Sequence, residues 1–184
     1  MPVSAVALAY FTVVEDQRTG WTGGLLLLSS GGRPLEFQCT LPVRPSRAHE
    51  ILFGVSLREH LIGEVIGPLL VKKCRTPISM LCCDQPESMA MDGVTDFPIA
   101  LVVDAAEEEE GPISSDTLTG CGDVMLAGTQ LLVPMEQVEQ AALVADQMKD
   151  LADASEPFER IREAIKEAHS QIARSQQASQ REAA

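Results

Sequence analysis

Aromatic residues are scarce in this sequence: Phe, Trp and Tyr together make up 4% of its 184 residues. Aliphatic side chains must therefore fill any core, and a hydrophobic content of 45% is sufficient to form one. A chain of this length predicts one domain, or one domain with an appendage.

Positive charge is also scarce: the sequence has 14 Lys and Arg residues but 27 Asp and Glu residues, which gives a net charge of −13. Binding to a phosphate backbone depends on Lys and Arg, so the composition predicts that nucleic acid is not a partner. No apolar run is long enough to span a bilayer. The apolar N-terminus lacks a basic region and reads as a strand, so we expect neither a signal peptide nor a membrane partner.

Paired cysteine spacings are missing. The five cysteines are odd in number and follow no disulfide framework, which predicts reduced thiols and a cytoplasmic location. Neither C-x-x-C nor H-x-x-x-H occurs, so we expect no bound metal. Phosphate-binding glycine motifs are absent too, and no cofactor is predicted.

The clearest folding signal is a hairpin followed by a helix. Residues 25–30 form an apolar run, Gly31 and Gly32 suit a tight turn, and the return strand alternates in polarity. This alternation predicts that Leu35, Phe37, Cys39 and Leu41 lie on one buried face.

A helix should follow the two prolines that end this strand. Ser46 is a candidate N-cap for a short helix that ends before Gly54. Ser56 and Glu59 match a capping box, which predicts a second helix over residues 56–73, kinked at Pro68. The spacing of the apolar residues predicts that Leu61, Val65 and Leu69 face a sheet.

Further strands are predicted at residues 3–14, 78–83 and 97–103, whereas the acidic run within residues 105–112 suggests a solvated loop. Residues 124–133 fit either a strand or a glycine-centred hairpin. The predicted fold class is α+β, with an antiparallel or mixed sheet of about five strands. One kinked helix packs on a face of the sheet, and a C-terminal helical pair follows.

The character of the chain changes after Pro134, which suggests an α+β domain over residues 1–134 and a helical extension with a frayed end over residues 135–184. In the extension, Phe158, Ile161, Ile165 and Ile172 form an apolar stripe. A lone helix of this length is marginal in water, so something must cover the stripe. The stripe could be covered by the protein's own domain or by a helix of another chain, and the sequence favours neither.

Two groups of residues are candidate sites. Cys82, Cys83 and Asp84 end a predicted strand, where His49 or His60 could activate a cysteine, although two small buried thiols explain the same pattern. Arg33, Arg44, Arg47 and His49 gather near a helix start and could bind an anion.

These patterns favour a non-enzymatic protein-interaction or adaptor protein, which acts through its C-terminal amphipathic helix or a sheet edge. Its partner would be another protein or a second copy of the chain. A small-ligand or anion-sensing regulatory domain is one alternative, and a cysteine-dependent enzyme is another.

Overall fold

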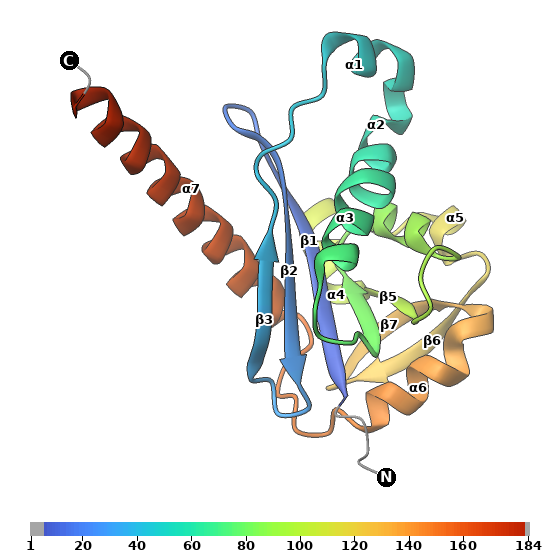
Figure 1. Ribbon diagram of the computed structural model, residues 1–184. Helices are drawn as coiled ribbons and strands as arrows, with labels where there is room; N and C mark the ends of the chain where they lie inside the picture. The colour runs from blue at the N-terminus through green and yellow to red at the C-terminus, as the bar shows by residue number, and fades with distance from the viewer. Residues whose placement is uncertain (1–5, 183–184) are drawn as a thin grey trace.

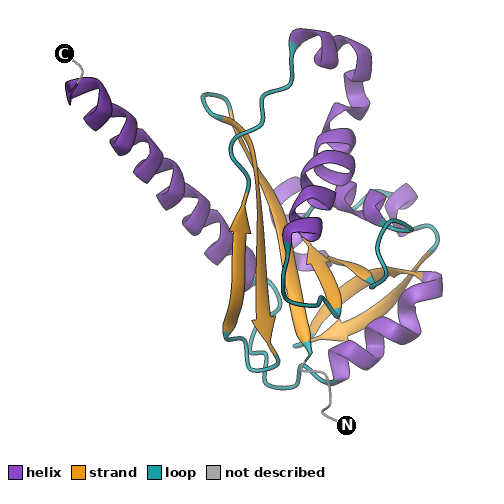
Figure 2. Ribbon diagram, viewed as in Figure 1, coloured by secondary structure: helices purple, strands orange, loops and turns teal. Residues whose placement is uncertain are grey.

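The computed structural model describes the backbone of residues 6–182 and the side chains of residues 6–178. Its centre is a mixed sheet of seven strands in the order β3-β2-β1-β4-β5-β7-β6 (Figures 1 and 2). The strands are β1 (Ala7–Asp16), β2 (Gly20–Ser29), β3 (Pro34–Cys39), β4 (Met80–Cys83), β5 (Ile99–Val102), β6 (Cys121–Leu126) and β7 (Thr129–Pro134). The predicted α+β class with a mixed sheet is confirmed. Residues 3–5 of the first predicted strand lie outside the described residues.

The sheet has more strands than predicted because residues 121–134 form an antiparallel hairpin. Ala127 and Gly128 both have positive φ angles, 49° and 81°, as a tight hairpin turn requires. The glycine-centred alternative is therefore correct. The strands β4 and β5 run parallel to β1, whereas β2, β3, β6 and β7 pair with their neighbours in antiparallel fashion.

Helices cover both faces of the sheet, where the prediction had one helix on one face (Figure 2). Leu61, Ile62, Ile66 and Leu70 from the helices after β3 pack on one face. The other face receives α6 (Val138–Asp146) and α7 (Glu156–Glu182). None of the described helices is both long and apolar enough to cross a membrane.

The segment after β3 is a chain of short helices: α1 (Arg47–Phe53), a 3-10 turn (Gly54–Ser56), α2 (Leu57–Glu59), a π-helix (His60–Ile66) and α3 (Gly67–Lys73). Ser46 caps α1 as predicted, because its hydroxyl accepts a hydrogen bond from the His49 N–H. The predicted capping box is wrong, since the Ser56 hydroxyl donates to the Phe53 carbonyl and α2 has no side-chain cap.

The π-helix also corrects the predicted buried face. Leu61 is buried, but Val65 and Leu69 are 36% and 40% exposed. A π-helix bonds each residue to the fifth one along, so it rotates later residues relative to an α-helix. Ile66 and Leu70 therefore take the inward positions.

The predicted buried face of β3 is exposed. Leu35, Phe37 and Leu41 are 47%, 39% and 75% exposed, and Cys39 is exposed as well. The alternation was read correctly, but β3 is an edge strand, and α7 packs on β1 and β2 instead. A Cβ on Gly24 of β2 would lie only 2.3 Å from Ile161, which shows how closely α7 approaches that strand.

The acidic run is a helix and not the predicted loop. It forms α4 (Val103–Glu110), which buries Ala105 and Ala106 against the sheet. Glu109 and Glu110 form ion pairs with Arg162 and Arg58, so arginines from elsewhere in the chain compensate the local repulsion.

The C-terminal stripe packs on the protein's own sheet. Phe158, Ile161 and Ile165 are at most 1% exposed, and the Phe158 ring meets Tyr10 edge to face with centroids 5.1 Å apart. Ile172, the fourth predicted interaction residue, is 39% exposed. The helix continues to Glu182 and projects away from the sheet (Figure 1).

Candidate functional site

Asp84 follows β4 directly and lies beside Thr12 of β1. The two strands are parallel and pair Phe11 with Cys83, so the next residue of each strand occupies the same level of the sheet. The Thr12 hydroxyl donates to Asp84 Oδ2 over 3.0 Å, and neither residue is more than 1% exposed. Carboxyl ends of parallel strands are common positions for ligand sites.

Arg162 of α7 joins this carboxylate to two others. Its Nη2 contacts Asp84 Oδ2 and lies 2.9 Å from Glu109 Oε1, while its Nη1 lies 2.7 Å from Glu159 Oε1. One guanidinium group therefore connects β4, α4 and α7.

Burial dominates the electrostatics of Asp84. Desolvation raises its pKa to about 7, although Arg162 and the Thr12 hydroxyl favour the ionised form and oppose this rise. The other carboxylate oxygen, Oδ1, is buried and accepts no hydrogen bond from any residue that the structure describes. A buried carboxyl group with a raised pKa and an unsatisfied oxygen is a candidate for chemistry.

Arg162 also lines a cavity of about 520 Å³ that contains a second arginine, Arg58. The Nε of Arg58 lies 2.5 Å from Glu87 Oε1, and its Nη2 contacts Glu110. We call this region, lined by Arg58, Glu87, Glu109, Glu110 and Arg162, the acidic cavity. Each of its arginines is paired with carboxylates inside it.

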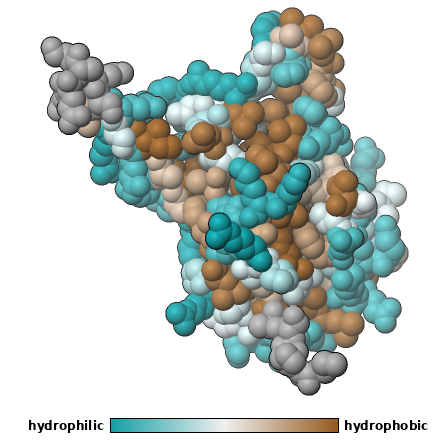
Figure 3. Space-filling model, viewed as in Figure 1, coloured by the Kyte–Doolittle hydropathy of each residue, from teal (hydrophilic) through white to brown (hydrophobic). Residues whose placement is uncertain are grey.

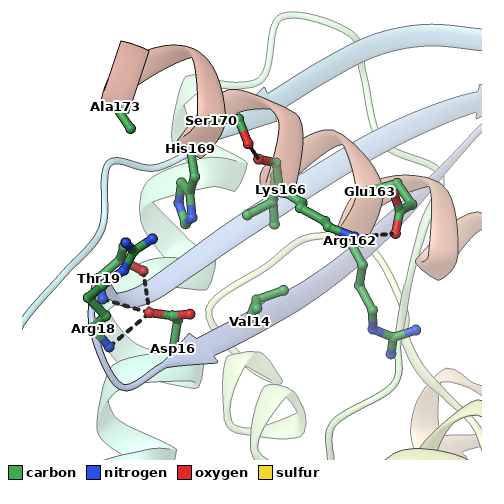
Figure 4. Close-up of a pocket in the computed structure, with 11 residues that line it drawn as sticks. Val14, Asp16, Arg18, Thr19, Arg162, Glu163, Lys166, His169, Ser170 and Ala173 are labelled. Atoms are coloured by element: carbon green, nitrogen blue, oxygen red, sulfur yellow. Dashed lines mark hydrogen bonds and ion pairs between the residues drawn. The ribbon is translucent and has the colours of Figure 1, made fainter. Parts of the chain in front are cut away.

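A second cavity, of about 490 Å³, separates α7 from the turn between β1 and β2 (Figure 4). Arg18, Lys166 and His169 line it, and Arg162 lies at one end, shared with the acidic cavity. It shares Arg18 and His169 with a further cavity of about 430 Å³, which Arg44, Leu41 and Ile172 also line. We call these two connected cavities the α7 groove.

Hydrogen bonds fix the walls of the α7 groove. Asp16 Oδ1 accepts from the N–H and hydroxyl of Thr19 and from the N–H of Arg18, and the bonds from Thr19 are the main cause of the lowered pKa of Asp16. Arg44 Nε donates to the Thr19 carbonyl over 3.1 Å. Within the described part of the chain, neither Arg18 nor Arg44 forms an ion pair, so both guanidinium charges are available to a ligand.

The structure does not bring the predicted anion-binding residues together. Arg44 lines the α7 groove, whereas Arg33 lies in the turn at the other end of β3. Arg47 pairs with Glu50, and the His49 ring packs edge to face on Phe53 within α1, which stands apart from the sheet (Figure 1).

The two candidate nucleophiles are inaccessible. Cys82 and Cys83 are completely buried, and desolvation raises the pKa of each thiol far above its usual value. A thiolate is the nucleophilic form, so neither residue is suited to this role. His60 binds Glu64 and stacks on Phe53 instead of meeting a cysteine.

The groups that define the site beside Asp84 were missed by reasoning from the sequence. Thr12 is one residue in an apolar strand, and Arg162 and Lys166 are ordinary charged positions on an amphipathic helix. The one available signal was the position of Asp84 at the end of a buried strand.

No protein-family model matches this sequence, and no curated protein does. Among solved structures, the fold is similar to Ciona intestinalis endonuclease V in complex with a 24mer DNA that contains an inosine followed by a ribo-adenosine. The TM-score is 0.50 and the identity 10%, over 91% of this chain and 89% of that one. For human ENDOV the TM-score is 0.47 and the identity 12%, over 91% of this chain and 87% of that one. For a variant of the Ciona enzyme in complex with a 23mer DNA, the TM-score is 0.48 and the identity 9%, over 93% of this chain and 88% of that one.

The first of these likenesses corrects the function predicted from the sequence. That prediction described a non-enzymatic protein-interaction or adaptor protein without a nucleic-acid partner, whereas the fold is similar to that of an endonuclease solved in complex with DNA. The exclusion of nucleic acid rested on the net charge of −13, which describes the whole molecule and not the α7 groove.

Proposed function

We propose that this chain binds the sugar-phosphate backbone of a nucleic acid in the α7 groove. The observation that carries this proposal is the gathering of Arg18, Arg44 and Lys166 along one groove that ends at Arg162. Guanidinium groups bind phosphate oxygens through two parallel hydrogen bonds, and an ammonium adds a point charge. The shared fold with a nuclease supports the same ligand class.

Local charge can favour a polyanion here despite the acidic composition. Interactions between exposed charges are largely screened beyond about 10 Å at 0.1 M salt, so distant carboxylates contribute little. The groove also contains two carboxylates: Asp16, which its hydrogen bonds keep ionised, and Glu163, which lies 3.7 Å from Lys166. The cations along the groove, Arg18, Arg44, Lys166 and Arg162, outnumber them.

Cleavage of a phosphodiester at Asp84 is not assigned to this chain. A pKa of about 7 suits general acid-base catalysis. The carboxyl group is, however, completely buried and lines neither the acidic cavity nor the α7 groove, so neither water nor a phosphate reaches it there.

Many nucleases hold metal ions between carboxylates, and the residues near Asp84 do not fit this arrangement. The guanidinium of Arg162 lies between Asp84 and Glu109, where a cation would have to sit. Among the described residues, no three His, Cys, Asp or Glu side chains are placed to hold an ion together. We therefore assign no metal-dependent step.

Binding can be tested by fluorescence anisotropy with labelled DNA and RNA oligonucleotides at low salt. We expect Arg18→Ala to weaken binding about tenfold, as the loss of one charged hydrogen bond predicts. Lys149→Ala is the matched control, because Lys149 is exposed and lies outside the groove. Equal affinities of the two variants, or no binding by the wild type, would refute the proposal.

We also propose a reducing compartment such as the cytoplasm. The support is that all five cysteines are unpaired in the structure, two of them fully buried. Reduced thiols are typical of cytosolic proteins.

A further inference from the structure

Strand β3 and the residues just after it carry an exposed apolar row beside the α7 groove. The row consists of Leu35, Phe37 and Cys39 of β3 and of Leu41, two residues beyond the end of the strand, and we call it the β3 stripe. Leu41 is 75% exposed and Phe37 39% exposed, so both offer side-chain surface to a ligand. An apolar row on an edge strand favours aggregation unless something covers it, which makes its exposure informative.

The β3 stripe lies on the same face of the sheet as α7. In the antiparallel pairing of β2 with β3, Gly24 is opposite Cys39 and Leu26 is opposite Phe37. Residues directly opposite each other share a face. Gly24 faces Ile161 and Ile165 of α7, so Cys39 and Phe37 must face the same side.

The stripe and the groove meet at Leu41. This residue lines the groove together with Ile172 of α7 and the cationic Arg18 and Arg44. Figure 3 shows brown and tan surface between the C-terminal part of α7 and the sheet, with teal side chains at its edge. The end of the apolar row at Leu41 is therefore bordered by cations, and this combination complements a ligand with apolar faces and an anionic backbone.

We infer that the β3 stripe binds the unpaired bases of a nucleic acid whose backbone lies in the α7 groove. This inference rests on the proposed function and names its substrate class: single strands. Base faces stack well on aromatic side chains, and Phe37 supplies one at the centre of the stripe.

The spacing of the stripe favours unstacked bases. Alternate residues of β3 lie about 6.6 Å apart, from a rise of about 3.3 Å per residue. This is about twice the spacing of about 3.4 Å between neighbouring stacked bases of one DNA strand. Bases seated on successive residues of the stripe must therefore leave the stack, which a duplex resists and a single strand does not.

The test measures the affinity of the full chain for labelled oligonucleotides of about twelve nucleotides, a length within the range of single-strand binding sites. The probes are a single strand, its duplex and the same single strand with abasic sites. We expect the single strand to bind at least about tenfold more tightly than the other two, given what one stacked base contributes.

Two neutral variants then locate the bases without altering charge. Phe37→Ala should bind the single strand about tenfold more weakly than the wild type does. Abasic sites in the probe should then change the affinity of this variant little. Leu41→Asn should behave similarly, and because Leu41 is 75% exposed, the substitution should change the stability of the fold little. Met125→Ala is the matched control, since Met125 is 60% exposed on β6, the opposite edge strand.

The outcomes distinguish base binding at the β3 stripe from backbone binding in the α7 groove. If Arg18→Ala weakens binding while Phe37→Ala and Leu41→Asn match the Met125→Ala control, the groove binds nucleic acid and the stripe does not. Equal affinity for single strand and duplex also overturns the inference. Absence of binding to every probe overturns both proposals.

Discussion

The acidic cavity and the α7 groove both contain arginines, but they use them differently. In the acidic cavity, Arg58 and Arg162 each contact carboxylates of other elements. In the groove, Arg18 and Arg44 bind only backbone groups or face solvent among the described residues. Paired arginines hold the fold together, whereas unpaired ones remain available to a ligand.

This difference shows why net charge was a poor guide to function. The count of −13 sums every charge wherever it lies, although the carboxylates Glu87, Glu109 and Glu110 line the acidic cavity and not the α7 groove. What a polyanion meets is the potential of one groove, which the nearest unpaired side chains determine. The following variants alter the two regions separately, and the largest expected effect comes first.

Truncating Phe158 should damage both regions, because α7 supplies a wall to each. Phe158 is fully buried against Tyr10, and Phe→Ala changes in cores cost about 3–5 kcal/mol. Urea unfolding of Phe158→Ala measures this loss. Ile172→Ala is the control on the same helix, where partial exposure predicts a much smaller change. Equal stability of the two variants would mean that α7 is not anchored as described.

The pKa of Asp84 makes the acidic cavity sensitive to pH. Its folded pKa of about 7 lies above the ordinary 3.8, so the folded protein holds a proton there that the unfolded chain has lost. The resulting stabilisation is complete below about pH 4 and disappears as the pH rises through 7, a change on the order of 4 kcal/mol. Asp84→Asn cannot lose a proton, so its stability relative to the wild type should rise over this range.

Thermal unfolding between pH 4 and 8 measures this difference, and Asp16→Asn provides a control whose stability gap to the wild type should stay constant over this range. The pKa of Asp16 is lowered from 3.8, so its contribution to stability is fully present above about pH 4 and is lost only at lower pH. A pH-independent gap between the wild type and Asp84→Asn would contradict the raised pKa of Asp84.

Local signals in the sequence predicted local structure well. The turn at Gly31 and Gly32 and the cap at Ser46 depend on residues within a few positions, and both form as expected. The inward face of residues 61–70 was misread because a π-helix changes the period, and no residue type specifies a π-helix. The acidic helix α4 was missed because its compensating arginines lie elsewhere in the chain.

The candidate site was less predictable because its members are distant in sequence. Asp84 attracted attention as a strand-terminal residue, but Thr12 is 72 positions away and Arg162 is 78 positions away. Only the parallel pairing of β1 with β4 and the docking of α7 bring them together. Without the strand order, the sequence could not indicate which polar residues meet.

Matched substitutions of one arginine from each region give the smallest expected effects and test the comparison directly. Arg162→Met should destabilise the fold by about 1–3 kcal/mol, because it leaves the buried Asp84 without its cation. Asp84 can then take up a proton, which limits the cost at neutral pH and makes it grow as the pH rises. Arg18→Met should change stability by less than about 0.5 kcal/mol, since Arg18 is exposed. Urea unfolding of both variants at two pH values measures these costs. If they are equal, the distinction between structural arginines in the acidic cavity and available arginines in the α7 groove is wrong.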